Sequence, residues 1–198
     1  MRRRTLLLAV GGGSASALIG SGAFSSVQTQ RGAELVIERD PDAYLGLDGC
    51  PGSSNASYTR LDERGHLEID LSPSNSTIGS GKAATGTGVN SDSFTYFHNV
   101  FQVCNRGKEP VKVWIEATAR KPASRLKADK EFKEYAREDR VIFYQGDNPS
   151  NRVDSEKTAL TMDVGKCVCI GFRTMTKGLE AGDRLLADDN VIIRTKLD

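Results

Sequence analysis

Two long β-prone runs in the middle of the chain constrain its fold more than any other feature of the sequence. They cover residues 94–104 and 111–117, and both are rich in aromatic and β-branched side chains. Such side chains favour extended backbone, because they pack well on a pleated surface. Residues 105–110, which include Gly107 and Pro110, predict a short turn between the two runs. We therefore expect the runs to pair as a β-hairpin.

Six further segments have the composition or the alternation of strands. They cover residues 32–38, 66–71, 140–144, 158–162, 166–173 and 190–195. One amphipathic surface helix is expected within residues 124–137, where apolar residues recur at helical spacing. A parallel sheet would need helical crossovers between most strands, and a single helix cannot supply them. The expected fold is mainly β, an antiparallel two-sheet sandwich of jelly-roll-like form with one surface helix.

The N-terminus has the layout of an export signal. Arg2, Arg3 and Arg4 precede an uncharged and mildly apolar stretch, which ends in small residues around Ala23. This stretch suits a twin-arginine signal better than a membrane anchor, which needs about 20 strongly apolar residues. We expect a signal peptide at residues 1–23 and one β-sandwich domain at residues 24–198, located outside the cell or on its surface. An uncleaved signal would be the only part to enter a membrane.

Four cysteines follow the signal, at Cys50, Cys104, Cys167 and Cys169. An even number of cysteines in an exported chain predicts disulfides. Cys167 and Cys169 are one residue apart in an expected strand, so their side chains share a face and are poorly placed to bridge each other. We expect each of them to pair with Cys50 or Cys104, and the sequence leaves both arrangements open.

The sequence gives no indication of an enzyme. Its two histidines, His66 and His98, offer few candidates for a general base or a metal ligand, and no nucleophile-elbow pattern occurs. Its 27 basic and 26 acidic residues nearly cancel, so no overall field would attract nucleic acid. No catalytic residue, cofactor, resident metal or nucleic-acid partner is expected.

Two candidate glycosylation sites lie in segments that we expect to be exposed loops. The acceptor patterns are Asn55-Ala56-Ser57 and Asn75-Ser76-Thr77. Attached glycans would keep these loops at the surface of an exported protein.

Residues 2–8, 20–25 and 33–37 together resemble the N-terminal region of exported proteins of halophilic archaea. The signal junction, the short strand after it and residues 101–113 are more distantly similar to the TasA/camelysin-type biofilm fibre proteins and archaeal bundling pili. This resemblance implies a sandwich whose N-terminal strand, freed by signal cleavage, completes a sheet of the next subunit. The donor strand would carry Ala33, Leu35 and Ile37. The alternative is that this strand pairs within its own domain and the protein stays monomeric.

Two functions follow as expectations. The first is a secreted or cell-surface structural or adhesive protein, whose partners are further copies of itself in a homopolymer, other surface proteins or glycans. The second is a surface module that binds carbohydrate or metal through the cysteines or through Tyr58, Tyr96 or Trp114. Trp114, the single tryptophan, is expected in the core rather than at such a site.

Overall fold

The computed structural model describes residues 38–73, 75, 88–119, 135, 138–179, 183 and 185–197. These residues belong to the second of two units into which the chain divides, residues 37–198. The expected signal peptide and the donor residues Ala33, Leu35 and Ile37 lie outside them. So does almost all of the segment in which the surface helix was expected.

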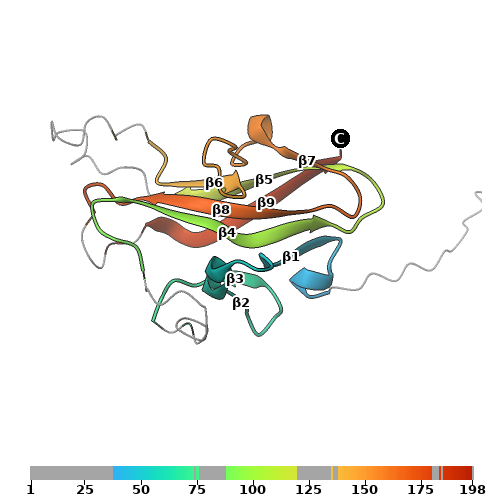
Figure 1. The fold of residues 1–198 in the computed structure, drawn as a ribbon, viewed down its shortest axis with the longest axis horizontal. Helices are drawn as coiled ribbons and strands as arrows, with labels where there is room; N and C mark the ends of the chain where they lie inside the picture. Colours follow the sequence, from blue (N-terminus) through green and yellow to red (C-terminus); the bar gives the residue numbers. More distant parts are fainter. Residues whose placement is uncertain are drawn as a thin grey trace, which may run out of the picture. The chain divides into compact units, whose positions relative to one another are not determined.

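Every strand pair of the described residues is antiparallel, as the sequence predicts, and the strands form three sheets (Figure 1). The largest sheet has four strands in the order β1-β4-β8-β6. Their bounds are Leu45–Gly49 for β1, Phe94–Asn105 for β4, Cys167–Met175 for β8 and Val141–Gln145 for β6. The long strands β4 and β8 run side by side at the centre of this sheet (Figure 1).

The second sheet has three strands in the order β7-β5-β9, and a two-stranded hairpin joins β2 to β3. Their bounds are Leu160–Met162 for β7, Val111–Ala119 for β5, Leu186–Leu197 for β9, Thr59–Leu61 for β2 and Leu67–Ile69 for β3. Within the described part of the chain the helical elements are short 3-10 turns: η1 at Asp40–Asp42, η2 at Ser54–Tyr58 and η4 at Glu156–Thr158. The protein is therefore mainly β.

The predicted hairpin between β4 and β5 is wrong, because the two strands belong to different sheets. β4 pairs with β1 and β8, whereas β5 pairs with β7 and β9. The side chain of Asn105 holds the connection: its Nδ2 donates to the carbonyls of Glu109 and Met162, and its Oδ1 accepts the amide of Gly107. A connection of this length can cross the roughly 10 Å between packed sheets, so each strand gains a neighbour on both sides.

The four-stranded and three-stranded sheets share one hydrophobic core. Val100, Phe101, Val103, Phe143, Ile170 and Phe172 come from the first sheet, and Val113, Ile115 and Met162 from the second. The rings of Phe97 and Phe172 stack with their centroids 4.8 Å apart, and Tyr58 meets Phe97 edge-on at 5.5 Å. Each large side chain removed from water contributes about 1.5–3 kcal/mol, so this cluster is a main source of stability.

A bulge interrupts the pairing of β4 with β8 between Phe97 and Phe101. At its centre Asn99 has a φ of 51°, and its amide donates to the carbonyl of Gly146. Bulges of this kind bend a strand and increase its local twist.

Candidate functional site at the sheet edges

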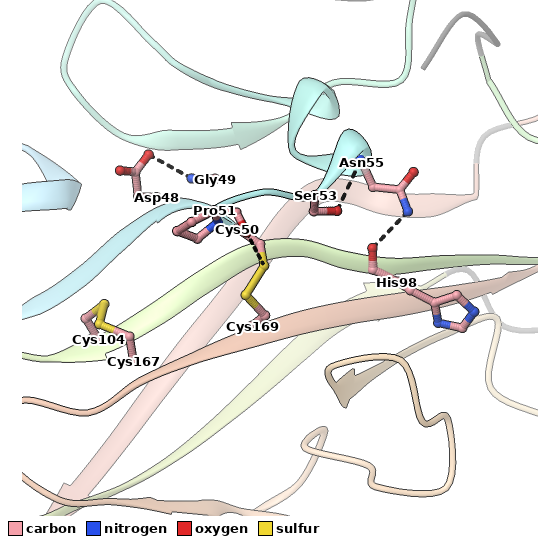
Figure 2. Close-up of a disulfide and its surroundings, with 10 residues drawn as sticks. All are labelled: Asp48, Gly49, Cys50, Pro51, Ser53, Asn55, His98, Cys104, Cys167 and Cys169. Atoms are coloured by element: carbon pink, nitrogen blue, oxygen red, sulfur yellow. Dashed lines mark hydrogen bonds between the residues drawn. A yellow bond between two sulfur atoms is a disulfide. The ribbon is translucent and has the colours of Figure 1, made fainter. Parts of the chain in front are cut away.

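Two disulfides brace the four-stranded sheet (Figure 2). Cys104 and Cys167 are direct partners in the register of β4 and β8, with their Cα atoms 4.0 Å apart. Cys50, one residue past the end of β1, is joined to Cys169 with a Cα–Cα distance of 5.5 Å. The expectation that Cys167 and Cys169 bridge to Cys50 and Cys104 is confirmed, and no cysteine is free. Two disulfides indicate a non-reducing environment.

The segment after Cys50 is held against β4 by hydrogen bonds as well as by the disulfide. The amide of Cys50 donates to the carbonyl of Val100, and the Nδ2 of Asn55 donates to the carbonyl of His98 at 2.8 Å (Figure 2). Ser53 caps the start of η2 by accepting the amide of Asn55. These contacts make the end of β1 a well-anchored part of the sheet.

Both candidate glycosylation sites use their amide nitrogen in the folded chain. Asn55 is half-buried and donates to His98, while Asn75 is 3% exposed and donates to the carbonyls of Ser57 and Asp70 at 2.9 and 2.8 Å. A glycan replaces one of the two hydrogens on Nδ2, so at Asn75 it would remove at least one of the two hydrogen bonds. Use of the two acceptor patterns stays a prediction, and at Asn75 it would have to precede folding.

The aromatic residues proposed for ligand binding do not form one exposed face. Tyr58 and Trp114 are buried, and Trp114 Nε1 donates to Glu116 Oε1 at 2.7 Å. Only Tyr96 of the three is exposed. Burial of Trp114 is as expected, and the disulfide-bonded cysteines are not available as metal ligands. Among the described residues, no three His, Cys, Asp or Glu side chains gather as a metal site would require.

The two histidines lie in different surroundings. His66 is exposed, with its Nδ1 3.3 Å from Asp62 Oδ2. His98 Nδ1 lies 3.1 Å from the hydroxyl of Tyr144, which is fully buried and also 3.3 Å from the carbonyls of Phe97 and Phe172. Burial raises the pKa of Tyr144 well above its ordinary value of 10. The hydroxyl therefore stays protonated and acts as a structural hydrogen-bond donor.

A surface hollow of about 310 Å³ opens where β1 begins, the β4–β5 connection turns and β9 ends. Its lining includes Tyr44, Leu45, Asn105, Val111 and Leu197. Leu45 and Val111 also pack against the core cluster, so the hydrophobic core reaches the surface here. Tyr44 and Leu197 are 74% and 64% exposed, which leaves an uncovered apolar patch beside the hollow.

The edges of the two large sheets differ in how well they are covered. Residues 151–153 cover the outer edge of β6, through a bridge between Tyr144 and Arg152 and a hydrogen bond from Val153 to Phe143. In the described part of the chain β9 pairs with β5 alone, through Val191–Leu197 and Leu186, with a register shift between these two parts. Its exposed side chains include those of Val191 and Ile192. These edges and the hollow were not identified from the sequence, because edge position depends on strand order.

No helix within the described ranges is long and apolar enough to cross a membrane. No protein-family model matches the chain, and no curated protein matches it in sequence.

Proposed function

We propose that this protein is a secreted or cell-surface structural or adhesive protein, whose two large sheets form a jelly-roll-like sandwich and which assembles by donating an N-terminal strand between copies. The observation that carries this proposal is the surface hollow at the start of β1, where the core residues Leu45 and Val111 are open to solvent. A donated strand would cover these side chains and pair with the nearby edge of β1.

Export is supported by the two disulfides and by the arginine-rich N-terminus. Disulfides persist in oxidising compartments and are rare in the cytosol. Both bridges lie in the four-stranded sheet, so they would protect the part of the molecule that receives the donated strand. Structural proteins outside the cell meet proteases and mechanical load, and covalent bracing slows unfolding under both.

The donor residues would share one face of an extended strand. Ala33, Leu35 and Ile37 alternate with other residues, so in an extended strand they share one apolar face. The chain enters the described domain at a fixed point, because Asp40 donates its amide to Gly65 and accepts the amide of Leu67. Residues 24–37, when extended, reach about 45 Å from that point, which is far enough to contact a neighbouring copy.

The hollow also favours the second candidate, a module that binds carbohydrate. Its volume of about 310 Å³ is at the lower limit for small-ligand sites, which is roughly 300 Å³. The exposed ring of Tyr44, with Lys108 and Glu109 at the same hollow, combines an apolar surface with polar groups. A sugar would stack on the ring and form hydrogen bonds to these side chains.

The mature chain, residues 24–198, and two variants of it separate these functions. Leu35→Asp with Ile37→Asp places charges on the donor face, and Val36→Asp is the matched control on the opposite face. We expect the mature chain and the control to form polymers in size-exclusion chromatography and negative-stain microscopy. The double variant should stay monomeric with the same thermal unfolding temperature.

Two outcomes would overturn the assembly. One is a mature chain that stays monomeric at high concentration, and the other is a double variant that polymerises as well as the control. If the monomeric chain binds glycans and Tyr44→Ala abolishes that binding, carbohydrate binding would be established as the function instead.

A further inference from the structure

The two disulfides differ in how far they are open to solvent. Cys167 is exposed, whereas its partner Cys104 is 3% exposed. In the other bridge Cys50 is 4% exposed and Cys169 is half-buried. Thiol–disulfide exchange begins when a thiolate reaches one sulfur of the bridge, so access to that sulfur limits the rate. A small thiol would therefore reach the Cys104–Cys167 bridge first, and would reach it at Cys167.

The sulfur of Cys104, which leaves as a thiolate in such an attack, has a cation beside it. Cys104 and Gly46 are direct partners in the register of β4 and β1, so the two positions share one face of the sheet. A Cβ built at Gly46 would lie 2.8 Å from the Nε of Arg106. The Cβ positions of direct partners are about 4.5–5.5 Å apart, so the guanidinium lies next to the side chain of Cys104. A guanidinium in this position stabilises a thiolate and makes it a better leaving group.

The charges around the two bridges differ in the same sense as their exposure. The Sγ of Cys50 lies 4.0 Å from the carbonyl oxygen of Pro51, whose partial negative charge disfavours a thiolate beside it. Lys166, by contrast, precedes Cys167 in the chain and is exposed. Its ammonium group attracts an anionic thiolate towards Cys167. Charge and access therefore both favour exchange at the same bridge.

The backbone pairing around Cys104 and Cys167 does not depend on the bridge that joins them between β4 and β8 (Figure 2). The amide of Asn105 donates to the carbonyl of Lys166, so the neighbouring Cys104–Cys167 pair is a non-hydrogen-bonded pair of the ladder. Separation of the two sulfurs therefore breaks no backbone hydrogen bond between these residues. The domain can stay folded while this bridge is open.

We propose that Cys167 is a thiol-exchange site, at which a small-molecule thiol forms a mixed disulfide and releases Cys104. The attacking thiolate forms a bond to the Sγ of Cys167, the bond between the two cysteine sulfurs breaks, and Cys104 leaves as a thiolate that takes up a proton from water. The sulfur of the incoming thiol is oxidised as that of Cys104 is reduced, so no other oxidant is needed. The step reverses when the thiolate of Cys104 attacks Cys167 and expels the small thiol.

The exchange site adjoins the surface hollow at the start of β1. Asn105 follows Cys104 directly and is the register partner of Leu45, and both residues line the hollow. The bridge is therefore a covalent restraint on one wall of the hollow, and exchange at Cys167 removes it. The exchange itself does not depend on what the hollow binds.

Reduced glutathione at about pH 8 is the probe, added to the folded mature chain and quenched at early times with N-ethylmaleimide. Tandem mass spectrometry of tryptic peptides locates both labels, and it has to fragment peptide 167–173, which contains Cys167 and Cys169. We expect glutathione on Cys167 and N-ethylmaleimide on Cys104. These labels should accumulate at least about tenfold faster than any label on Cys50 or Cys169.

Arg106→Gln tests the role of the cation beside the leaving sulfur. It should slow exchange at Cys167 about threefold, because the rate depends moderately on the acidity of the leaving thiol. Lys108→Gln is the matched control: it removes another cation of the β4–β5 connection, one that lines the hollow, and should leave the rate nearly unchanged. Thermal unfolding of both variants shows that the fold is kept. Equal exchange rates in the two variants would overturn the proposed assistance by Arg106.

The proposal is overturned if glutathione appears first on Cys50, Cys104 or Cys169, or if neither bridge exchanges while the chain remains folded. The readout is a covalent label, so it does not require any particular oligomeric state. The variant with Leu35→Asp and Ile37→Asp should show the same order of labelling as the unsubstituted mature chain. Failure of the exchange and failure of donor-strand assembly are therefore distinguishable.

Discussion

Cys50 and Cys169 are joined across β4, although β1, which ends one residue before Cys50, does not pair with β8. The second bridge, Cys104–Cys167, reaches β8 only two residues away. The sequence separations are 119 and 63 residues, but the two loops are not independent. When one bridge is removed, its two cysteines stay linked through the remaining bridge. The shortest such path contains roughly 55 residues, whichever bridge is removed.

We therefore predict that the two disulfides contribute equally to stability. Cys50→Ser with Cys169→Ser, and Cys104→Ser with Cys167→Ser, should each lower the free energy of unfolding by about 4 kcal/mol. Urea unfolding of the two double variants and of the unsubstituted chain measures this. A loss for one pair at least twice that for the other would show that local packing, rather than loop closure, determines their contribution.

The hydroxyl of Tyr144 provides a prediction about alkaline pH. It is fully buried against the carbonyls of Phe97 and Phe172 and the ring of His98, so Tyr144→Phe should cost about 1–3 kcal/mol at pH 7. The pKa of Tyr144 is raised in the folded state, so the unfolded chain ionises first, above about pH 10. The hydroxyl therefore makes its full contribution to the free energy of unfolding below about pH 10. This contribution is lost as the pH rises further.

Urea unfolding of both proteins between pH 7 and pH 11 checks the sign of this effect. The difference in unfolding free energy between the unsubstituted chain and Tyr144→Phe should narrow above pH 10. A difference that stays constant would mean that the hydroxyl ionises equally in both states.

The sequence predicted the kinds of local structure better than their pairing. Val141–Gln145 and Cys167–Met175 became strands at the expected places, because runs of β-branched and aromatic residues act locally. β4 and β5 are also strands, but they do not form a hairpin. A six-residue connection is compatible with pairing in one sheet or with crossing to another, and only the packing of both strands in the core decides between them.

The candidate site depended even more on tertiary structure. The sequence placed Cys167 and Cys169 on one face, where they are poorly placed to bridge each other, which is a local argument. It did not predict β1, whose residues 45–49 contain two glycines and an aspartate and resemble a turn. Burial by η1 and η2 and pairing with β4 outweigh that weak propensity. The hollow and the open edge of β9 arise from strand order, which no local pattern encodes.

Gly171 allows β8 to pass close to its neighbours at the bulge. A Cβ at this position would lie 2.6 Å from the carbonyl oxygen of Phe97 and 2.8 Å from that of Gly146. Because backbone cannot move aside cheaply, Gly171→Ala should lower the free energy of unfolding by about 1–3 kcal/mol or more. Gly107→Ala is the control, since its nearest contact is a side-chain atom of Asn105 at 3.1 Å. Gly171→Ala should unfold at a clearly lower temperature than the control. Equal unfolding temperatures would contradict the close approach of Gly171 to the carbonyls of Phe97 and Gly146.

Glu116 links the outer face of β5 to β9 and provides a prediction about acid pH. Its two carboxylate oxygens accept hydrogen bonds from Arg194 Nε and Trp114 Nε1. The hydrogen bond from Arg194, followed by that from Trp114, lowers the pKa of Glu116 below its ordinary value of 4.5. The unfolded chain therefore takes up the proton first as pH falls, so the stability from this carboxylate is present above pH 4.5 and is lost below it.

Glu116→Gln should accordingly lower the urea midpoint at pH 7 and have little effect at a pH below the folded-state pKa of Glu116. Glu109→Gln, in the exposed β4–β5 connection, is the control and should leave the midpoint nearly unchanged at both pH values. A midpoint that Glu116→Gln lowers equally at both pH values would show that the charge of Glu116 does not account for its contribution to stability.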